Sequence, residues 1–324
     1  MFFLKKERLD DGTRNIIFCG VKIFSYKRIK NKQFSQKKYL NYKKYNDLAH
    51  DIKKNLYKIP SNIDLVMGIP RSGMIPAYMI GLFINKKVCS VQEFIAGVLG
   101  NKGFTRKVAE KQIKTILVVD DTINTGDSIN KIKELLEPYK DKYNFFFMAV
   151  YSASKKLPGN IDFYFEYLSQ PRIFQWNYMY HSVIKTACYD MDGVLCIDPT
   201  EEENDDGEKY INFIKNAKPL YIPNYEIGYV VTSRLEKYRK ETEEWLEKHG
   251  IRYKKLYMLN ATAKERREQK LHAIFKAKIY KELKDASLFI ESNSNQAKQI
   301  AEISKKRCIC CETDEMYGEH YENN

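Results

Sequence analysis

The segment Ile116–Ile129, with the sequence ILVVDDTINTGDSI, decides the first half of the fold. Its apolar start predicts a buried strand, and its end predicts the beginning of a helix. Between them lie two adjacent acids, Asp120 and Asp121, and a short turn that contains Gly126. Because α/β proteins bind ligands at the ends of their strands, this turn is predicted to line a ligand site.

The turn has the properties of a phosphate site. Backbone amides at the start of a helix lack partners within the helix and, together with the helix dipole, favour a phosphate dianion. The residues predicted to form this cradle are Asn124, Thr125, Gly126, Asp127 and Ser128. Asp120 and Asp121 would repel a phosphate, so they suit a sugar diol and a hydrated Mg²⁺ better. The alternative is an ordinary strand–turn–helix with an aspartate cap.

An earlier loop offers a second site for an anion. The sequence MGIPRSGMIPA, residues 67–77, follows a short apolar strand that precedes the first turn. Its Gly68, Arg71, Ser72 and Gly73 combine a tight turn, a cation and hydrogen-bond donors. These groups suit a diphosphate.

Together the two loops resemble the binding signature of type I phosphoribosyltransferases for 5-phosphoribosyl 1-diphosphate (PRPP). The resemblance implies that Asp120 and Asp121 contact the ribose hydroxyls, that the turn holds the 5-phosphate and that the earlier loop binds pyrophosphate, with Mg²⁺. The family places a mobile loop between these motifs, and GNKGFTRKVAEKQ, residues 100–112, has that character. Arg106 and Lys107 are its expected diphosphate contacts. A plain basic surface loop is the alternative for this segment.

A second pair of acids follows another apolar run. The sequence YDMDGVL, residues 189–195, places Asp190 and Asp192 two positions apart at a predicted strand end. It resembles the first motif of haloacid-dehalogenase-like phosphatases. That resemblance implies that Asp190 is the nucleophile that forms an aspartyl-phosphate and that Asp192 is the general acid and base. The Asp190 carboxylate and the Asp192 carbonyl would hold Mg²⁺.

The later motifs of that family follow in order, in VVTSR, FKAKIYKEL and LFIES. They imply that Thr232 contacts a phosphate oxygen, that Lys276 neutralises the aspartyl-phosphate, with Lys278 as second choice, and that Glu291 binds the metal. Many relatives carry a further carboxylate where this chain has Ser292 and Asn293, so a pseudophosphatase is an alternative.

The spacing of these motifs leaves no room for a large cap domain. In this respect the chain resembles open-site members of the family, which act on bulky substrates. Only 36 residues separate Gly193 from Val230, and 41 separate Arg234 from Lys276. The acidic stretch DPTEEENDDGEKY, residues 198–210, is either a solvated loop or a substrate gate.

Strands alternate with helices along most of the chain, which predicts an α/β protein with parallel sheets. We expect two Rossmann-like domains, a type I phosphoribosyltransferase fold followed by a minimally capped haloacid-dehalogenase-like fold. The period of apolar residues predicts a helix from about Ser35 to Leu56. The expected boundaries are 1–36 for a basic N-terminal arm, 37–169 for the first domain, 170–183 for an aromatic linker and 184–324 for the second domain. The linker, QPRIFQWNYMY, is apolar enough to pack against one or both domains.

The positive charge is concentrated at the start of the chain. Residues 1–60 hold 16 Lys and Arg against 5 acids, a net of +11 out of +13 for all 324 residues. This is either a solvated arm or a contact for an anionic membrane surface or polymer. Since no nucleic-acid-binding signature is present, no nucleic acid is expected as a partner.

The composition fits a reducing compartment. No apolar run reaches the length of a membrane helix, and the first residues do not form a secretory signal. The cysteines are scattered apart from Cys308, Cys310 and Cys311, which fits the cytoplasm. If the basic arm binds a membrane, the protein would lie at the inner membrane surface. These three cysteines and His320 indicate a terminal strand, with a zinc site as the lesser alternative.

The order of the two motif sets suggests a function. It resembles the phosphoribosyltransferase–phosphatase portions of bacterial capsule polymerases, which build ribofuranose into surface polymers. This resemblance, at motif level from about residue 37 to 316, implies transfer of 5-phosphoribose from PRPP to a surface polysaccharide or other glycan. Hydrolysis of the 5-phosphate, with Mg²⁺ at both sites, would then leave a ribofuranosyl group. Two alternatives are a nucleobase phosphoribosyltransferase with a nucleotidase domain, and a PRPP sensor that controls a phosphatase.

Overall fold

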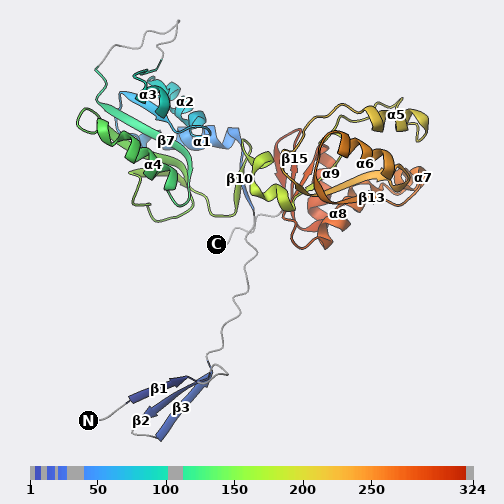
Figure 1. The fold of residues 1–324 in the computed structure, drawn as a ribbon, viewed down its shortest axis with the longest axis horizontal. Helices are drawn as coiled ribbons and strands as arrows, with labels where there is room; N and C mark the ends of the chain where they lie inside the picture. The colour runs from blue at the N-terminus through green and yellow to red at the C-terminus, as the bar shows by residue number, and fades with distance from the viewer. Residues whose placement is uncertain (1–3, 9–12, 19–20, 28–39, 101–111, 319–324) are drawn as a thin grey trace. The chain divides into compact units, whose positions relative to one another are not determined.

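The computed structural model of the protein describes residues 4–8, 13–18, 21–27, 40–100 and 112–318. The chain divides into two compact units, Met1–Lys38 and Tyr39–Asn324. The first unit contains an antiparallel sheet in the order β1-β2-β3 (Figure 1). Its strands are β1 (Leu4–Arg8), β2 (Thr13–Phe18) and β3 (Val21–Lys27).

The second unit begins with a lobe built on a parallel sheet of five strands in the order β6-β5-β7-β8-β9. The strands are β5 (Leu65–Gly68), β6 (Lys87–Ser90), β7 (Thr115–Ile123), β8 (Asn144–Ser152) and β9 (Phe163–Tyr167). The helices are α1 (Tyr45–Asn55), α2 (Met74–Phe83), α3 (Val91–Ile95) and α4 (Asp127–Leu136).

Helices cover both faces of this sheet. Side chains of α1 and α2 form one core with alternate residues of β5, β7 and β8. Side chains of α3 and α4 form a second core with the residues in between. A parallel strand buried on both faces is apolar at consecutive positions, and Ile116–Val119 in β7 are all completely buried. This explains why the strand could be recognised from its sequence.

The second lobe has a six-stranded sheet in the order β13-β12-β11-β14-β15-β16, in which only β16 is antiparallel to its neighbour. The strands are β11 (Cys188–Tyr189), β12 (Ile227–Leu235), β13 (Tyr253–Leu259), β14 (Leu288–Glu291), β15 (Arg307–Cys310) and β16 (Glu315–Tyr317). The helices are α5 (Glu208–Asn216), α6 (Arg239–Lys248), α7 (Ala263–Glu268), α8 (Leu271–Glu282) and α9 (Ser294–Ser304).

The two faces of this sheet are again covered by different helices. One core contains side chains of α5, α6 and α7, and the other contains side chains of α8 and α9. The prediction of an α/β fold with two parallel sheets is therefore confirmed, with the single antiparallel edge strand β16 as the exception. Among the described residues, no helix has the length and apolar character needed to cross a bilayer.

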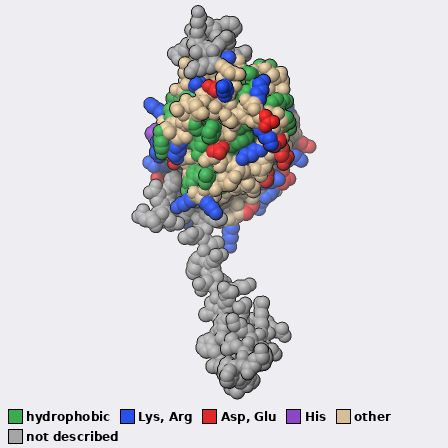
Figure 2. Space-filling model, turned by 90° about the vertical axis from the view of Figure 1, so that its left-hand side faces the viewer, with side chains coloured by type: hydrophobic (Ala, Val, Ile, Leu, Met, Phe, Trp, Pro, Cys, Tyr) green, Lys and Arg blue, Asp and Glu red, His purple; other side chains and the backbone are tan. Residues whose placement is uncertain are grey.

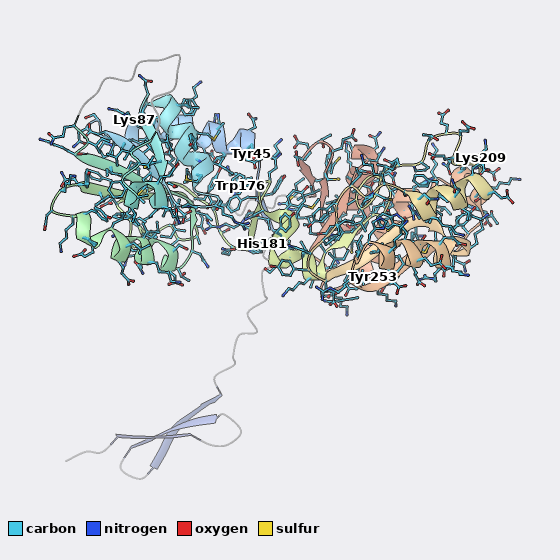
Figure 3. The ribbon with its side chains drawn as sticks, turned by 45° about the horizontal axis from the view of Figure 1, so that its top comes forward. Tyr45, Lys87, Trp176, His181, Lys209 and Tyr253 are labelled. Atoms are coloured by element: carbon cyan, nitrogen blue, oxygen red, sulfur yellow. The ribbon has the colours of Figure 1, made fainter. Side chains whose placement is uncertain are left out.

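The segment between the lobes is ordered by contacts with both of them. Its strand β10 (Arg172–Phe174) pairs in parallel with β4 (Asn41–Lys43). Trp176 contacts the ring of Tyr45 (Figure 3) and also stacks on Phe174. Tyr178 lies in the core of the second lobe. The prediction that this segment packs against the domains agrees with these contacts.

The predicted helix from about Ser35 to Leu56 was too long at its start. Residues 41–43 form strand β4, and α1 begins only at Tyr45, where the periodic apolar positions begin. The reason is the pairing of β4 with β10, which lies about 130 residues later and leaves no signal in the local sequence.

The charge beyond the first 60 residues is nearly balanced, with a net of +2. In Figure 2, basic and acidic side chains are interspersed on the face that is drawn. The excess of positive charge therefore belongs to the start of the chain, as the sequence indicates.

Candidate functional site

The predicted phosphate turn connects β7 to α4 at the carboxyl edge of the first sheet. Gly126 caps the helix in the left-handed conformation, with φ of +88°. A Cβ atom there would lie only 1.8 Å from the side-chain nitrogen of Asn160, which donates a hydrogen bond to the Gly126 carbonyl. Glycine is therefore favoured by the backbone conformation, and a larger residue would also displace the Asn160 side chain. Thr125 donates a hydrogen bond to Asp127 within the turn (2.8 Å).

Asp120 and Asp121 are the last acids of β7 and are both buried. One carboxylate oxygen of Asp121 accepts a hydrogen bond from the Ser72 hydroxyl (3.0 Å), and the other accepts from the Trp176 indole nitrogen (2.7 Å). Asp120 accepts from the backbone amide of Asp121 (2.9 Å). Burial, with a further contribution from Asp121, raises the pKa of Asp120 to about 8. Among the described residues, no lysine or arginine forms an ion pair with either acid.

The predicted pyrophosphate loop lies beside these acids, because β5 and β7 are neighbours in the sheet. Gly73 fits closely against β7: a Cβ atom there would lie 2.8 Å from the Val119 carbonyl oxygen. Gly68 is similarly enclosed by Met74 and Ala77. Arg71 is exposed on the loop. The structure thus brings Gly68, Arg71, Ser72 and Gly73 to the edge that carries Asp120 and Asp121, whereas Arg106 and Lys107 lie outside the described residues.

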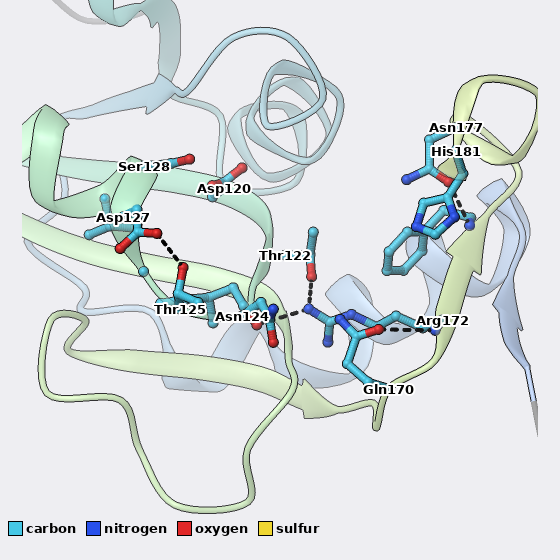
Figure 4. A pocket seen from close by; sticks show the side chains of 14 residues that line it. Asp120, Thr122, Asn124, Thr125, Asp127, Ser128, Gln170, Arg172, Asn177 and His181 are labelled. Carbon is cyan, nitrogen blue, oxygen red and sulfur yellow. Dashed lines mark hydrogen bonds between the residues drawn. The ribbon is translucent and has the colours of Figure 1, made fainter. Parts of the chain in front are cut away.

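A cavity of about 300 Å³ opens at the phosphate turn. Besides Asp120 and the turn, it is lined by residues of the segment between the lobes, to which the sequence analysis gave no role in the site. Figure 4 shows them on the side of the pocket opposite Thr125, Asp127 and Ser128. They are Gln170, Arg172, Phe174, Asn177 and His181. The polar side chains among them, within an otherwise aromatic stretch of sequence, were the signal that could have indicated a role in the site.

Arg172 anchors this wall to the end of β7. Its guanidinium donates to the carbonyl oxygens of Leu168 and Ile123 (2.8 Å each) and also contacts the Thr122 hydroxyl. Burial lowers its pKa to about 10, although Asp121 acts in the opposite direction. The cation is thus engaged in positioning the backbone and does not face the cavity as a free charge.

The second predicted site also lies at a carboxyl edge, at the ends of the adjacent strands β11 and β14. Lys276, from α8, is buried between two carboxylates, and it donates hydrogen bonds to Asp190 and to Glu291 (2.7 Å). The other oxygen of Asp190 accepts from the amide of Met191 (2.8 Å). Burial raises the pKa of Asp190, and the Lys276 ammonium opposes this shift. The choice of Lys276 over the exposed Lys278 agrees with this geometry.

Asp192 is held by an arginine that sequence reasoning missed. The Nε atom of Arg234 lies 3.1 and 3.2 Å from the two carboxylate oxygens of Asp192, and its side chain is fully buried. Thr232 is also buried, and its hydroxyl accepts a hydrogen bond from the amide of Arg234 (3.2 Å), whereas Ser233 lines the adjacent cavity. The contact of Thr232 with a phosphate oxygen stays a prediction.

A cavity of about 310 Å³ lies above these acids. Its wall includes Asp198, Asn204 and Tyr210, so the acidic loop borders the site. Burial raises the pKa of Asp198, as do the neighbouring Asp192 and Glu291.

The cysteines near the C-terminal end lie on and beside the last parallel strand, β15. Cys308 and Cys310 are buried in β15, and Cys310 donates to the Ser292 carbonyl (2.9 Å). No group of three or more His, Cys, Asp or Glu suited to a metal occurs within the described ranges. His320 lies outside them.

Comparison with known proteins identifies the first lobe. Residues 35–154 match the family model of the phosphoribosyl transferase domain. This part of the chain is a phosphoribosyltransferase domain. A search of curated proteins found no significant match for the chain.

Similar solved structures include xanthine-guanine-hypoxanthine phosphoribosyltransferase of Helicobacter pylori, at 14% identity over 43% of this chain and 95% of that chain (TM-score 0.34). Another is purine phosphoribosyltransferase of Pyrococcus horikoshii, at 19% identity over 42% and 92% (TM-score 0.30). A third is orotate phosphoribosyltransferase of Aeropyrum pernix, at 15% identity over 48% and 77% (TM-score 0.25). The residues that match the family model, 35–154, include the turn, the acids and the loop described above.

Proposed function

We propose that the protein transfers 5-phosphoribose from PRPP to a glycan acceptor and then removes the 5-phosphate to leave a ribofuranosyl group. The first step belongs to the phosphoribosyltransferase domain. The second step is assigned to the site that contains Asp190, on the basis of its resemblance to haloacid-dehalogenase-like phosphatases and of the geometry around Lys276.

In the first step, the bond between C1 of the ribose and the pyrophosphate oxygen breaks, an acceptor hydroxyl attacks C1, and the proton of that hydroxyl passes to the departing pyrophosphate. The turn from Asn124 to Ser128 would hold the 5-phosphate, and Asp120 and Asp121 would orient the ribose hydroxyls. The loop with Arg71 and Ser72 would bind the departing pyrophosphate. Two buried acids without a paired cation fit a substrate that arrives with hydrated Mg²⁺, which neutralises diphosphate charge when bound.

In the second step, a carboxylate oxygen of Asp190 attacks phosphorus and the bond to the ribose oxygen breaks. That oxygen takes a proton from Asp192, and water then cleaves the aspartyl-phosphate. Lys276 fixes the nucleophile and offsets the charge of the phosphoryl group. Asp192 is held by Arg234, so protonation of the leaving group requires that one of its oxygens be released from this pair.

Mg²⁺ is also part of the proposal for the second site. Asp190 and Glu291 supply two carboxylates, and Mg²⁺ commonly binds through one or two carboxylates and keeps several waters, so the donor set fits without a third acidic side chain. The Asp192 carbonyl, which lies 3.4 Å from the Ser292 hydroxyl, would complete the protein ligands.

The observation that carries the proposal is the buried lysine between Asp190 and Glu291. Two buried carboxylates with a shared ammonium, at the ends of adjacent strands, form a pre-arranged nucleophile beside a charge-neutralising group. A purely structural ion pair would not need a cavity above it, and this one has a cavity bordered by both acids.

The test is the mass of the product. Candidate glycans are incubated with PRPP and Mg²⁺ and either wild-type protein or Asp190→Asn. The variant should release pyrophosphate at the wild-type rate, and its product should be heavier by one phosphate. Asp141→Asn, an exposed change of the same type, should behave like the wild type. Products of equal mass would show that the second site does not act on the product of the first.

A further inference from the structure

The wall of the first cavity opposite the phosphate turn comes from residues 170–181, which join the two lobes. Three neutral polar side chains contribute to it: Gln170 is exposed, and Asn177 and His181 are half-buried. The segment is fixed by the pairing of β10 with β4 and by the anchoring of Arg172. This wall is therefore in place before any ligand binds.

Each of the three side chains has its acceptor atom occupied by a nearby backbone amide. The Gln170 side-chain oxygen accepts from the Arg172 amide (3.2 Å), and the Asn177 oxygen accepts from the Phe174 amide (2.9 Å). The Nδ1 atom of His181 accepts from the Val183 amide (3.2 Å). These contacts settle which end of each amide carries the oxygen, and they place the proton of a neutral His181 on Nε2.

The donor atoms of the same side chains are free. Within the described parts of the chain, no group accepts a hydrogen bond from Gln170 Nε2, Asn177 Nδ2 or His181 Nε2. Burial lowers the pKa of His181, so the ring is neutral at pH 7. The wall thus offers three neutral donors, whereas each of its side-chain acceptors already takes a hydrogen bond from the backbone. The carboxylates of the cavity, Asp120 and Asp127, lie on the turn side instead (Figure 4).

A wall whose free polar groups are mainly donors distinguishes between classes of acceptor. A nucleobase presents both acceptors and N–H donors at its edge, and its donors would have to share oxygens that already accept from the backbone, at a cost in affinity. The hydroxyl and ring oxygens of a sugar each have lone pairs that accept such hydrogen bonds. A sugar hydroxyl can direct its own proton toward water or the turn side.

We infer that Gln170, Asn177 and His181 form the acceptor subsite of the phosphoribosyltransferase domain and that it takes a hydroxyl-rich, uncharged acceptor and not a nucleobase. The inference rests on the proposed function, because it assumes that PRPP occupies the phosphate turn. It assigns specificity to the segment between the lobes.

Two substitutions reverse the donors without disturbing the backbone. Asn177→Asp and Gln170→Glu keep the oxygen that accepts from the backbone but replace the free amide by a second acceptor oxygen. Asn144→Asp is the matched control, since Asn144 is exposed at the opposite end of β8. Binding of PRPP with Mg²⁺ is measured first by calorimetry on the full chain. Saturation-transfer NMR then measures binding of ribose, ribitol and short neutral oligosaccharides, and separately of adenine, hypoxanthine, guanine, uracil and orotate.

We expect the wild type to bind one or more of the sugars and none of the bases. Each donor-reversing variant should weaken sugar binding by about tenfold or more relative to the Asn144→Asp control. Binding of a base, failure of every sugar to bind, or sugar binding unchanged in both variants would overturn the inference. If PRPP itself does not bind, the proposed function fails at its first step, which is a separate outcome.

Discussion

The acids at the two strand-end sites differ in what holds them. In the first lobe, Asp121 accepts hydrogen bonds from a hydroxyl and an indole, and Asp120 accepts from a backbone amide. In the second lobe, Asp190 and Glu291 share Lys276, and Asp192 is paired with Arg234. The first pair of acids is oriented by neutral donors, and the second set is neutralised by buried cations.

This difference fits two kinds of chemistry. A site that orients a polyanionic substrate bound with a metal ion can leave its acids without a paired cation, because the metal ion supplies the neutralising charge when the substrate binds. A site where a carboxylate attacks phosphorus needs that carboxylate held in one position, with its charge offset, before the substrate enters. Buried ion pairs give such fixed geometry, although they contribute little net stability.

The largest effect is expected for Lys276→Met. Removal of the ammonium leaves two buried carboxylates facing each other, so we expect hydrolysis of p-nitrophenyl phosphate to fall by about 10²–10³. The free energy of unfolding should fall by about 3–5 kcal/mol, measured by urea denaturation. Pyrophosphate release from PRPP should not change.

Lys278→Met is the control for this change, because Lys278 is exposed two positions further along α8. It should alter neither activity nor stability by a measurable amount. If the two lysine variants behaved alike, neutralisation of Asp190 and Glu291 by the buried Lys276 would not be what distinguishes the second site from the first.

A smaller, pH-dependent effect is expected for Asp120→Asn. The pKa of Asp120 is about 8 in the folded protein against 3.8 for an ordinary aspartate, so between these values the folded form binds a proton that the unfolded chain does not. Wild-type stability should therefore fall as the pH rises from 4 to 8. At low pH the folded state is favoured because it binds the proton more tightly than the unfolded chain, and this advantage is lost as the pH rises. The asparagine variant lacks this loss and should be more stable than wild type by about 1–3 kcal/mol at pH 8, with little difference at pH 4.

Thermal or urea unfolding of Asp120→Asn at both pH values measures this difference, and Asp141→Asn serves as the exposed control. The same variant should release pyrophosphate from PRPP far more slowly than wild type. A variant that is less stable than wild type at pH 8 would mean that the surroundings stabilise the ionised form of Asp120. The contrast with the neutralised acids of the second lobe would then be wrong.

The smallest effect is expected for Trp176→Phe. The phenyl ring keeps an aromatic contact with Phe174 and Tyr45 but loses the hydrogen bond to Asp121. We expect the KM for PRPP to rise about 3–10-fold, with phosphatase activity unchanged. Trp245→Phe is a matched control, because Trp245 donates its indole hydrogen bond to the Ala217 carbonyl in the second lobe. An unchanged KM in Trp176→Phe would show that the neutral donors do not position Asp121.

The sequence alone determined most of the local structure at both sites. The strand, turn and helix from Ile116 to Ile129, the loop with Gly73 and the strand that ends before Asp190 all lie where predicted. These features depend on neighbours within a few residues: a run of apolar side chains, a glycine at a required conformation, or the start of a helix. Lys276, which was chosen through a resemblance to a known motif, donates a hydrogen bond to Asp190, and its role toward an aspartyl-phosphate stays a prediction.

Only the tertiary structure revealed which distant side chains hold these acids and line the first cavity. Trp176 reaches Asp121 across 55 positions of the chain, and Arg234 reaches Asp192 across 42. The pairing of β10 with β4 both shortened the predicted first helix and brought Gln170, Asn177 and His181 to the pocket. Such contacts depend on the order of strands in the sheets and on the path of the connecting segment, which the local pattern of residues does not encode.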